Sequence, residues 1–130
     1  MAYLFDTPSL AEVLRAVPSP LFVKRLSTVP SSDRWTTSIT VSQILIAARR
    51  TQKARLMQDV IRLVAAIKVA PFDTLASQSF AKFRCTVAHD ASTDDVMIAA
   101  IAVTHDFTLV TRRVETFRPY PHLRCEDWTI

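Results

Sequence analysis

Acidic residues flank two apolar segments that are far apart in the sequence. Asp6 directly follows the apolar run of residues 1–5, and Asp94 and Asp95 directly precede the apolar run of residues 96–103. A carboxylate after a buried strand and another in the first turn of a helix can meet at one edge of a parallel sheet, where ligands bind. Such oxygen ligands suit Mg²⁺, which takes one or two protein carboxylates and otherwise binds water or phosphate oxygen. The pattern predicts a divalent-cation site formed by Asp6 and the pair Asp94 and Asp95.

Taken singly, these acids also have purely structural interpretations. Asp6 could cap a helix or sit in a turn, and Asp94 and Asp95 are favoured near a helix N-terminus by the helix dipole. The three histidines show no metal-ligand spacing such as HxxxH. No second aspartate accompanies Asp6 and no lysine follows residues 108–111, which argues against an aspartyl-phosphate enzyme or a receiver-like signalling domain.

Composition limits the class of protein. Of the 130 residues, 49% are hydrophobic and 22% are charged, so we expect one globular domain over residues 1–130. The longest apolar run, residues 96–103, is too short to span a membrane, and no secretory leader precedes Asp6. Cys85 and Cys125 form no CxxC pair. We therefore expect a cytoplasmic protein with reduced thiols and no membrane association.

Charge and the absence of two residue types constrain function further. The net charge is +4 and the pI is about 9.5, which favours an acidic partner such as RNA or an acidic protein segment. The chain has no glycine and no asparagine, so it contains no P-loop, no GxGxxG motif and no GxSxG elbow. The usual nucleotide-cofactor enzymes are therefore excluded, and tight turns must use type I geometry, proline or strained residues.

Strand-like and helix-like segments alternate along the chain. Strands are predicted at residues 2–5, 35–39, 67–70, 108–111 and 123–126, and helices at 10–15, 21–28, from 41 onward with Thr40 as its cap, 53–66, 74–87 and 94–105. This alternation indicates an α/β fold with a parallel sheet of four to five strands and helices on both faces. Near the start of the chain, six apolar residues form a stripe: Val13, Leu14, Val17, Leu21, Phe22 and Leu26. We expect this stripe to belong to the core or to form a groove or dimer face.

Several segments, in this order, resemble the PIN-domain ribonucleases, and specifically the VapC toxins of bacterial toxin–antitoxin pairs. The resemblance covers nearly the whole chain and rests on residues 3–7 (YLFDT), 38–45 (SITVSQIL), 71–73 (PFD), 95–100 (DVMIAA), 108–112 (TLVTR), 114–117 (VETF) and 126–128 (EDW). It implies a PIN-like fold and an Mg²⁺- or Mn²⁺-dependent endoribonuclease acting on RNA. It also implies a cognate antitoxin protein as partner and a homodimer.

The resemblance also assigns roles to particular positions, with some departures. Asp6 and Asp95 match the family's metal-binding aspartates, and Gln43 stands where the family has a glutamate. Arg113 and Thr116 replace an amide or acid and an aspartate, respectively. Because an amide adds no charge and an arginine opposes a cation, a metal would bind weakly here.

Two interpretations of the departures stay open. In the first, Asp6, Asp95 and Gln43 form the catalytic group, Gln43 orients water, and Arg112 or Arg113 binds RNA phosphate. Asp94 or Glu115 would then support the cation. In the second, the domain is catalytically impaired and acts as a module that binds antitoxin or RNA.

Overall fold

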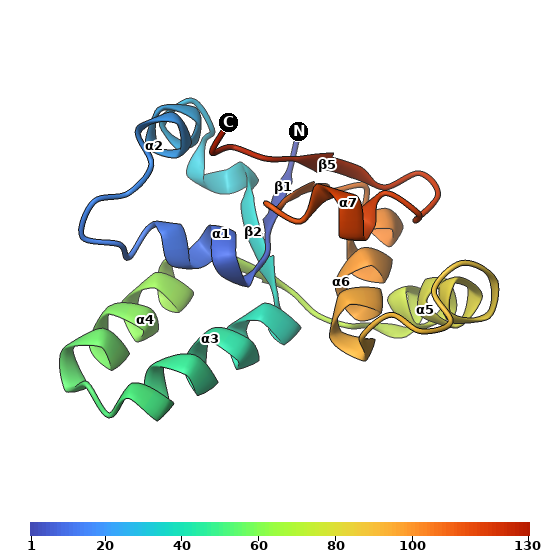
Figure 1. Ribbon diagram of the computed structural model, residues 1–130, viewed down its shortest axis with the longest axis horizontal. Helices are drawn as coiled ribbons and strands as arrows, with labels where there is room; N and C mark the ends of the chain where they lie inside the picture. Colours follow the sequence, from blue (N-terminus) through green and yellow to red (C-terminus); the bar gives the residue numbers. More distant parts are fainter.

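The chain is built on one parallel β-sheet, and the computed structural model describes all of residues 1–130 (Figure 1). The strands follow the order β3-β2-β1-β4-β5, and each neighbouring pair is parallel. They are β1 (Tyr3–Phe5), β2 (Arg34–Thr37), β3 (Lys68–Ala70), β4 (Thr108–Val110) and β5 (Arg124–Glu126). The helices are α1 (Thr7–Glu12), α2 (Pro20–Ser27), α3 (Ser38–Thr51), α4 (Ala54–Ala66), α5 (Thr74–Thr86), α6 (Thr93–Thr104) and α7 (Val114–Phe117), with a 3₁₀ turn η1 at Ser31–Asp33.

The alternation of side chains along the strands produces two hydrophobic layers. Leu4 of β1 and Leu109 of β4 are buried in a cluster with residues of α5 and α6. Tyr3, Phe5 and Val110 belong to a second cluster, which they share with α1, α2, α3 and α4. Helices therefore cover both faces of the sheet, as the sequence predicts.

Three strands end at the edge of the sheet where Asp6 lies. Asp6 follows β1, Thr37 ends β2, and Thr111 follows β4. The backbone N–H of Asp6 donates to the carbonyl of Val110 at 3.2 Å, which fixes the end of β1 against β4. The first turns of α1, α3 and α6 come together at this edge (Figure 1).

The predicted strands and helices are present in the predicted order, but some boundaries were wrong. The helix after β2 begins at Ser38 and not at Val41, and its cap is Thr37 and not Thr40. The Thr37 hydroxyl accepts a hydrogen bond from the Thr40 N–H at 2.9 Å, so the helix starts one turn earlier. Asp6 likewise caps α1, which begins at Thr7. The segments η1 and α7 were not predicted, because they are too short to show a periodicity.

Three turns adopt left-handed backbone without glycine or asparagine. Gln52, Asp106 and His122 have φ values of 58°, 57° and 65°. Each such residue costs about 1 kcal/mol relative to right-handed backbone. This confirms the expectation that strained residues would close some turns. Cys85 and Cys125 are free thiols. No helix combines the length and the apolar character needed to cross a membrane.

Candidate functional site

Asp6 is a buried carboxylate with one oxygen engaged and one oxygen unpartnered. Its side chain is only 1% exposed, and Oδ1 accepts the Ser9 N–H at 3.0 Å as the N-cap of α1. Oδ2 is buried and has no hydrogen-bond partner. A buried acceptor without a protein partner is rare because desolvation is costly, and this oxygen is therefore available to a ligand. The structural role of capping therefore accounts for only one of the two oxygens.

Asp95 lies in the first turn of α6 and pairs with Arg113. Its backbone N–H donates to the hydroxyl of Ser92, the helix cap, at 3.2 Å. The two terminal nitrogens of Arg113 donate to its two carboxylate oxygens at 3.0 and 2.9 Å. The hydrogen bonds to Asp95 raise the pKa of Arg113, as do the charges of Asp95 and Asp6, while burial opposes them. Asp6, Asp95 and Arg113 therefore belong to one electrostatic site.

Two aromatic residues that the sequence did not single out support this site. The guanidinium carbon of Arg113 lies 5.3 Å from the centre of the Phe117 ring, and Tyr120 packs against Phe117 with ring centres 6.0 Å apart. The Tyr120 hydroxyl is buried without a partner. Burial raises its pKa, and the charge of Asp95 raises it further. The short helix α7, which no sequence periodicity predicts, therefore positions Arg113 through the Phe117 ring.

Gln43 joins the two acidic segments of the site. From α3, its Nε2 donates to Oδ2 of Asp94 at 2.8 Å, and its Oε1 accepts a hydrogen bond from the hydroxyl of Thr7. Thr7 is the neighbour of Asp6, and Asp94 is the neighbour of Asp95. The structure therefore brings together Asp6, Gln43, Asp94, Asp95 and Arg113, which the sequence places on four different elements.

Arg112 belongs to a different cluster from Arg113. It forms an ion pair with Glu12 of α1, whose side chain is only 1% exposed. Arg15 also donates to Glu12 at 3.2 Å, and the backbone N–H of Ser19 donates at 2.7 Å. The Ser19 hydrogen bond lowers the pKa of Glu12, and Arg15 and Arg112 act in the same direction while burial opposes them. Arg112 therefore neutralises a buried acid, and of the two predicted phosphate ligands only Arg113 faces Asp95.

Glu12 is a residue of the site region that sequence reasoning missed. The available signal was an acid inside the apolar segment of residues 10–14. Glu115, considered as a supporting acid, instead pairs with Arg118 at 2.6 Å on the surface, where its side chain is 81% exposed.

The donor set fits a divalent cation only weakly. No three histidine, cysteine or acidic side chains come together in a metal-binding group. The unpartnered Oδ2 of Asp6 is nevertheless a free oxygen ligand, and Mg²⁺ needs no more than one or two protein carboxylates. Both oxygens of Asp95 already accept hydrogen bonds from Arg113, so a cation would have to compete with the guanidinium. Asp6 and Asp95 are the two residues that would hold it.

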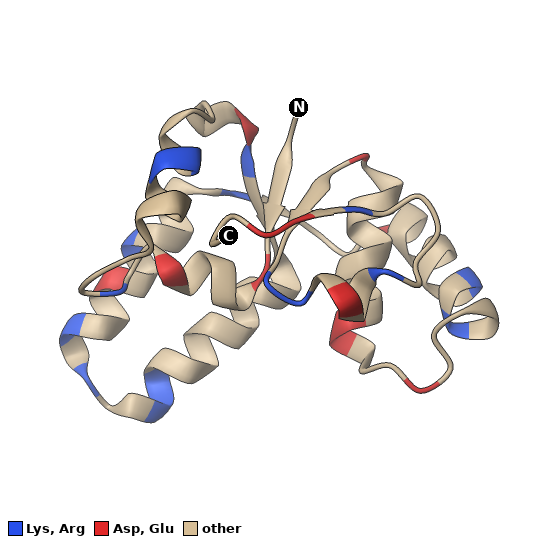
Figure 2. Ribbon diagram, turned by 45° about the horizontal axis from the view of Figure 1, so that its top comes forward, with Lys and Arg blue, Asp and Glu red and all other residues tan.

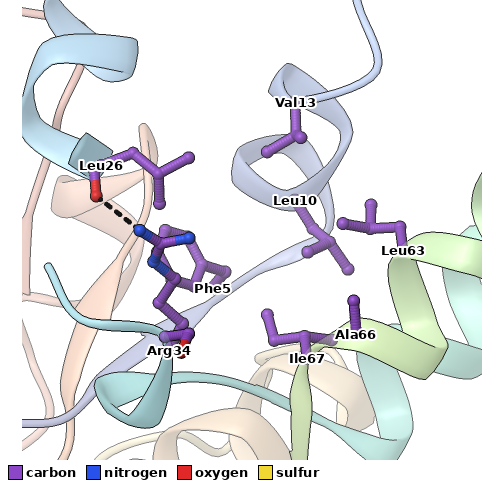
Figure 3. A pocket seen from close by; sticks show the side chains of 9 residues that line it. Phe5, Leu10, Val13, Leu26, Arg34, Leu63, Ala66 and Ile67 are labelled. Carbon is purple, nitrogen blue, oxygen red and sulfur yellow. Dashed lines mark hydrogen bonds between the residues drawn. The ribbon is translucent and has the colours of Figure 1, made fainter.

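An apolar cavity lies between α1, α2 and α4, and its lining contains none of the acidic residues of the site. Its volume is about 120 Å³, and seven of its nine lining residues are hydrophobic. Figure 3 shows side chains of α1, α2 and α4 converging on it, with Arg34 at its rim donating to the Leu26 carbonyl at 3.1 Å. Of the predicted apolar stripe, Val13 and Leu26 line the cavity, Phe22 is core, and Val17 and Leu21 are exposed.

Several solved structures share this fold. VapBC-1 from nontypeable Haemophilus influenzae aligns with a TM-score of 0.87 over 100% of both chains, at 21% identity. VapBC2 from Rickettsia felis, bound to a DNA fragment from its promoter, has a TM-score of 0.85 at 18% identity over 98% of this chain and 99% of that one. FitAcB from Neisseria gonorrhoeae has a TM-score of 0.81 at 23% identity over 97% of each chain. At these identities the likeness concerns the fold.

Family membership rests on the sequence itself. No curated protein matches the chain. The family model of the PIN domain matches residues 3–113, which extend from β1 through Arg113 and contain every residue of the candidate site. The chain belongs to the PIN-domain family.

Proposed function

We propose that this PIN domain is the toxin of a type II toxin–antitoxin pair and that it cleaves RNA phosphodiester bonds with Mg²⁺ or Mn²⁺. The observation that carries the proposal is the buried, unpartnered Oδ2 of Asp6 at the sheet edge where Asp95 and Gln43 also lie. PIN domains are generally nucleases, and two structural neighbours, from Klebsiella pneumoniae and Mycobacterium tuberculosis, are named as a toxin–antitoxin complex and as a member of the VapBC family of toxin–antitoxin systems. The proposed place of action is the cytoplasm.

Each residue at the sheet edge has its own proposed role. Asp6 and Asp95 would hold the cation, which when bound polarises a phosphodiester and lowers the pKa of an attacking water. Asp94 adds negative charge one residue away, and Gln43 holds Asp94 by a hydrogen bond of 2.8 Å. Gln43 is thereby placed to orient water at the site.

Arg113 sets the strength of cation binding. Its side chain is 42% exposed, so its ion pair with Asp95 is screened by solvent and is worth about 1 kcal/mol. Displacing it would therefore weaken cation binding by up to about fivefold, since 1.4 kcal/mol corresponds to a factor of ten. Once released from Asp95, the guanidinium has five N–H donors for a phosphate.

The apolar cavity is the proposed docking place of the antitoxin. Val13, the C-cap of α1, lines it and is 41% exposed, and three further exposed apolar residues follow in the loop after α1 and in α2, namely Val17, Leu21 and Val23. Exposed apolar side chains around an apolar cavity are typical of a protein interface. An apolar segment of the antitoxin would cover them. The resemblance further implies a homodimer, which light scattering of the purified protein measures.

A second function, favoured by the Asp95–Arg113 pair, is an inactive domain that binds antitoxin or RNA. If Arg113 keeps both oxygens of Asp95, Asp6 is the one remaining carboxylate of the proposed pair, and the cation loses the ligand that would join the two segments.

A cleavage assay separates the two functions. Single-stranded RNA is incubated with the purified protein in Mg²⁺ or Mn²⁺, and a parallel sample contains EDTA. The nuclease predicts cleavage with the metal only, lost in Asp95→Asn, whereas the impaired module predicts intact RNA in every sample. A matched control is Asp90→Asn, which removes the same charge from an exposed loop residue.

A further inference from the structure

The arginines of this protein divide into two groups by their hydrogen bonds. Eight of the twelve donate from their side chains to a carboxylate, hydroxyl or carbonyl oxygen: Arg15, Arg25, Arg34, Arg84, Arg112, Arg113, Arg118 and Arg124. The other four have no hydrogen-bonded or ion-pair partner: Arg49, Arg50, Arg55 and Arg62. All four are exposed, and all four lie on the hairpin that α3 and α4 form. The unengaged guanidinium groups are thus concentrated in one place.

The same hairpin carries the net charge of the whole chain. Residues 38–66 contain five basic residues, namely the four arginines and Lys53, and one acid, Asp59. The remainder has eleven basic and eleven acidic residues and is therefore neutral. Figure 2 shows basic residues at the free end of the hairpin. The basic character noted in the sequence is thus a local property of α3 and α4.

Folding alone does not explain this placement. Arg49 and Arg50 are in the last turn of α3, where the helix dipole favours cations. Lys53 precedes α4 and Arg55 lies in its first turn, where the dipole disfavours them, and that turn contains no acid. Arg55 forms no ion pair with Asp59, one turn along the helix. Two of the cations are therefore placed against the stability of the hairpin.

A hollow lies beside two of these cations, Arg49 and Lys53. Its volume is about 270 Å³, and it has a partly apolar lining of Ala48, Arg49, Gln52, Lys53, Ala54 and Met57. A nucleotide combines a flat apolar base with an anionic phosphate. A lining with both apolar and cationic side chains therefore suits a nucleotide. It suits an acidic peptide less well, because such a peptide has anionic groups but no flat apolar base.

Helix α3 connects this surface to the candidate active site. Gln43 lies near its beginning and Arg50 near its end, about 10 Å apart at 1.5 Å per residue. One RNA strand of a few nucleotides can therefore reach from the acidic edge to the hairpin. The acidic edge itself repels phosphate, so a separate basic surface is needed to hold the substrate.

We infer that the free end of the α3–α4 hairpin, with Arg49, Arg50, Lys53 and Arg55, is the surface that binds the backbone of single-stranded RNA beside the active site. This inference rests on the proposed function for the identity of the ligand. It assigns the affinity for RNA to the hairpin and the chemistry to the sheet edge.

The test is a comparison of two triple variants with the same change of charge. The hairpin variant is Arg49→Gln, Arg50→Gln and Arg55→Gln, and the control is Lys24→Gln, Lys82→Gln and Arg118→Gln, all at exposed positions. Binding of a labelled oligoribonucleotide of about twelve nucleotides is measured by fluorescence anisotropy in EDTA at several salt concentrations. Circular dichroism verifies that both variants are folded.

The hairpin variant should bind RNA about tenfold more weakly at 0.1 M salt, and its salt slope should fall by about two, since each single-strand phosphate contact contributes about 0.7. The control should change less than twofold. Equal losses in both variants, or no loss in the hairpin variant, would overturn the inference. Displacement of the RNA by a polyglutamate peptide of equal charge and length would also overturn it, in favour of an acidic protein ligand. The binding assay contains no metal, so its result does not depend on whether the protein cleaves RNA. A failure of the proposed nuclease function would be seen in the cleavage assay alone.

Discussion

Arg113 and Asp95 are joined by two parallel hydrogen bonds of 3.0 and 2.9 Å, so that a guanidinium lies against a carboxylate proposed to bind a divalent cation. The two residues come from different elements, because Arg113 precedes α7 and Asp95 lies in the first turn of α6. A bidentate pair of this kind is directional as well as electrostatic. A cation held by Asp95, as proposed, would therefore have to displace Arg113.

Replacing Arg113 should therefore strengthen metal binding. Arg113→Asn removes the competing charge, and we expect the affinity for Mn²⁺ to rise by up to about fivefold, the equivalent of one exposed ion pair of about 1 kcal/mol. Isothermal titration calorimetry measures this. Arg118→Asn is the control, because it breaks the exposed pair with Glu115 far from Asp95 and should leave the affinity unchanged. An unchanged affinity in Arg113→Asn would show that the guanidinium does not compete.

Gln43→Glu should reveal whether Gln43 faces the cation. A glutamate would lie against Asp94, which now accepts the Nε2 hydrogen bond at 2.8 Å, so we expect a lower melting temperature without metal. With Mn²⁺ the third carboxylate should raise the affinity tenfold or more and raise RNA cleavage with it. Gln78→Glu, an exposed position on α5, makes the same change of charge and should do neither. Loss of stability without any gain in affinity would mean that Gln43 has a structural role alone.

Glu12 should contribute to stability in a pH-dependent manner. Its pKa in the folded state is lowered, chiefly by the Ser19 N–H, so the unfolded chain binds its proton more readily than the folded one. The stabilisation is therefore complete above the ordinary glutamate pKa, and it is lost as the pH falls through the lower folded value. Urea unfolding measured between about pH 7 and pH 3 gives the free energy of unfolding at each pH. It should fall more steeply with decreasing pH in the wild type than in Glu12→Gln.

The control for that experiment is Glu115→Gln, whose side chain is exposed and pairs only with Arg118. It should follow the wild-type curve. If the free energy of unfolding falls equally with pH in Glu12→Gln and in the wild type, the buried Glu12–Arg112 pair does not govern stability in acid.

Much of the fold was predictable because it depends on local patterns. The apolar run after Asp95 is a buried helix, and residues 108–110 form the strand beside β1, as the alternation of segments indicates. The position of Asp6 at a strand end, next to the start of α6 at the sheet edge, also follows from the topology of a parallel sheet. The start of α3 was misplaced because several hydroxyl residues in sequence could each cap it, and only the geometry selects Thr37.

The details of the site were not predictable to the same degree. Arg112 and Arg113 are adjacent and chemically identical, yet one pairs with Glu12 and the other with Asp95. Which way each side chain points depends on the backbone after β4 and on the ring of Phe117. The bridge from Thr7 through Gln43 to Asp94 likewise joins residues of three helices, and no spacing along the chain encodes it.

The central claim is that Asp6 and Asp95 together hold a divalent cation, and titration of the metal-free protein with Mn²⁺ tests it most directly. Asp6→Asn and Asp95→Asn are the variants to compare, because asparagine caps a helix as well as aspartate does and leaves α1 intact. We predict weak but measurable binding to the wild type and no binding to either variant. Binding that is unchanged in Asp6→Asn, or in Asp95→Asn, would contradict the assignment of that carboxylate to the cation.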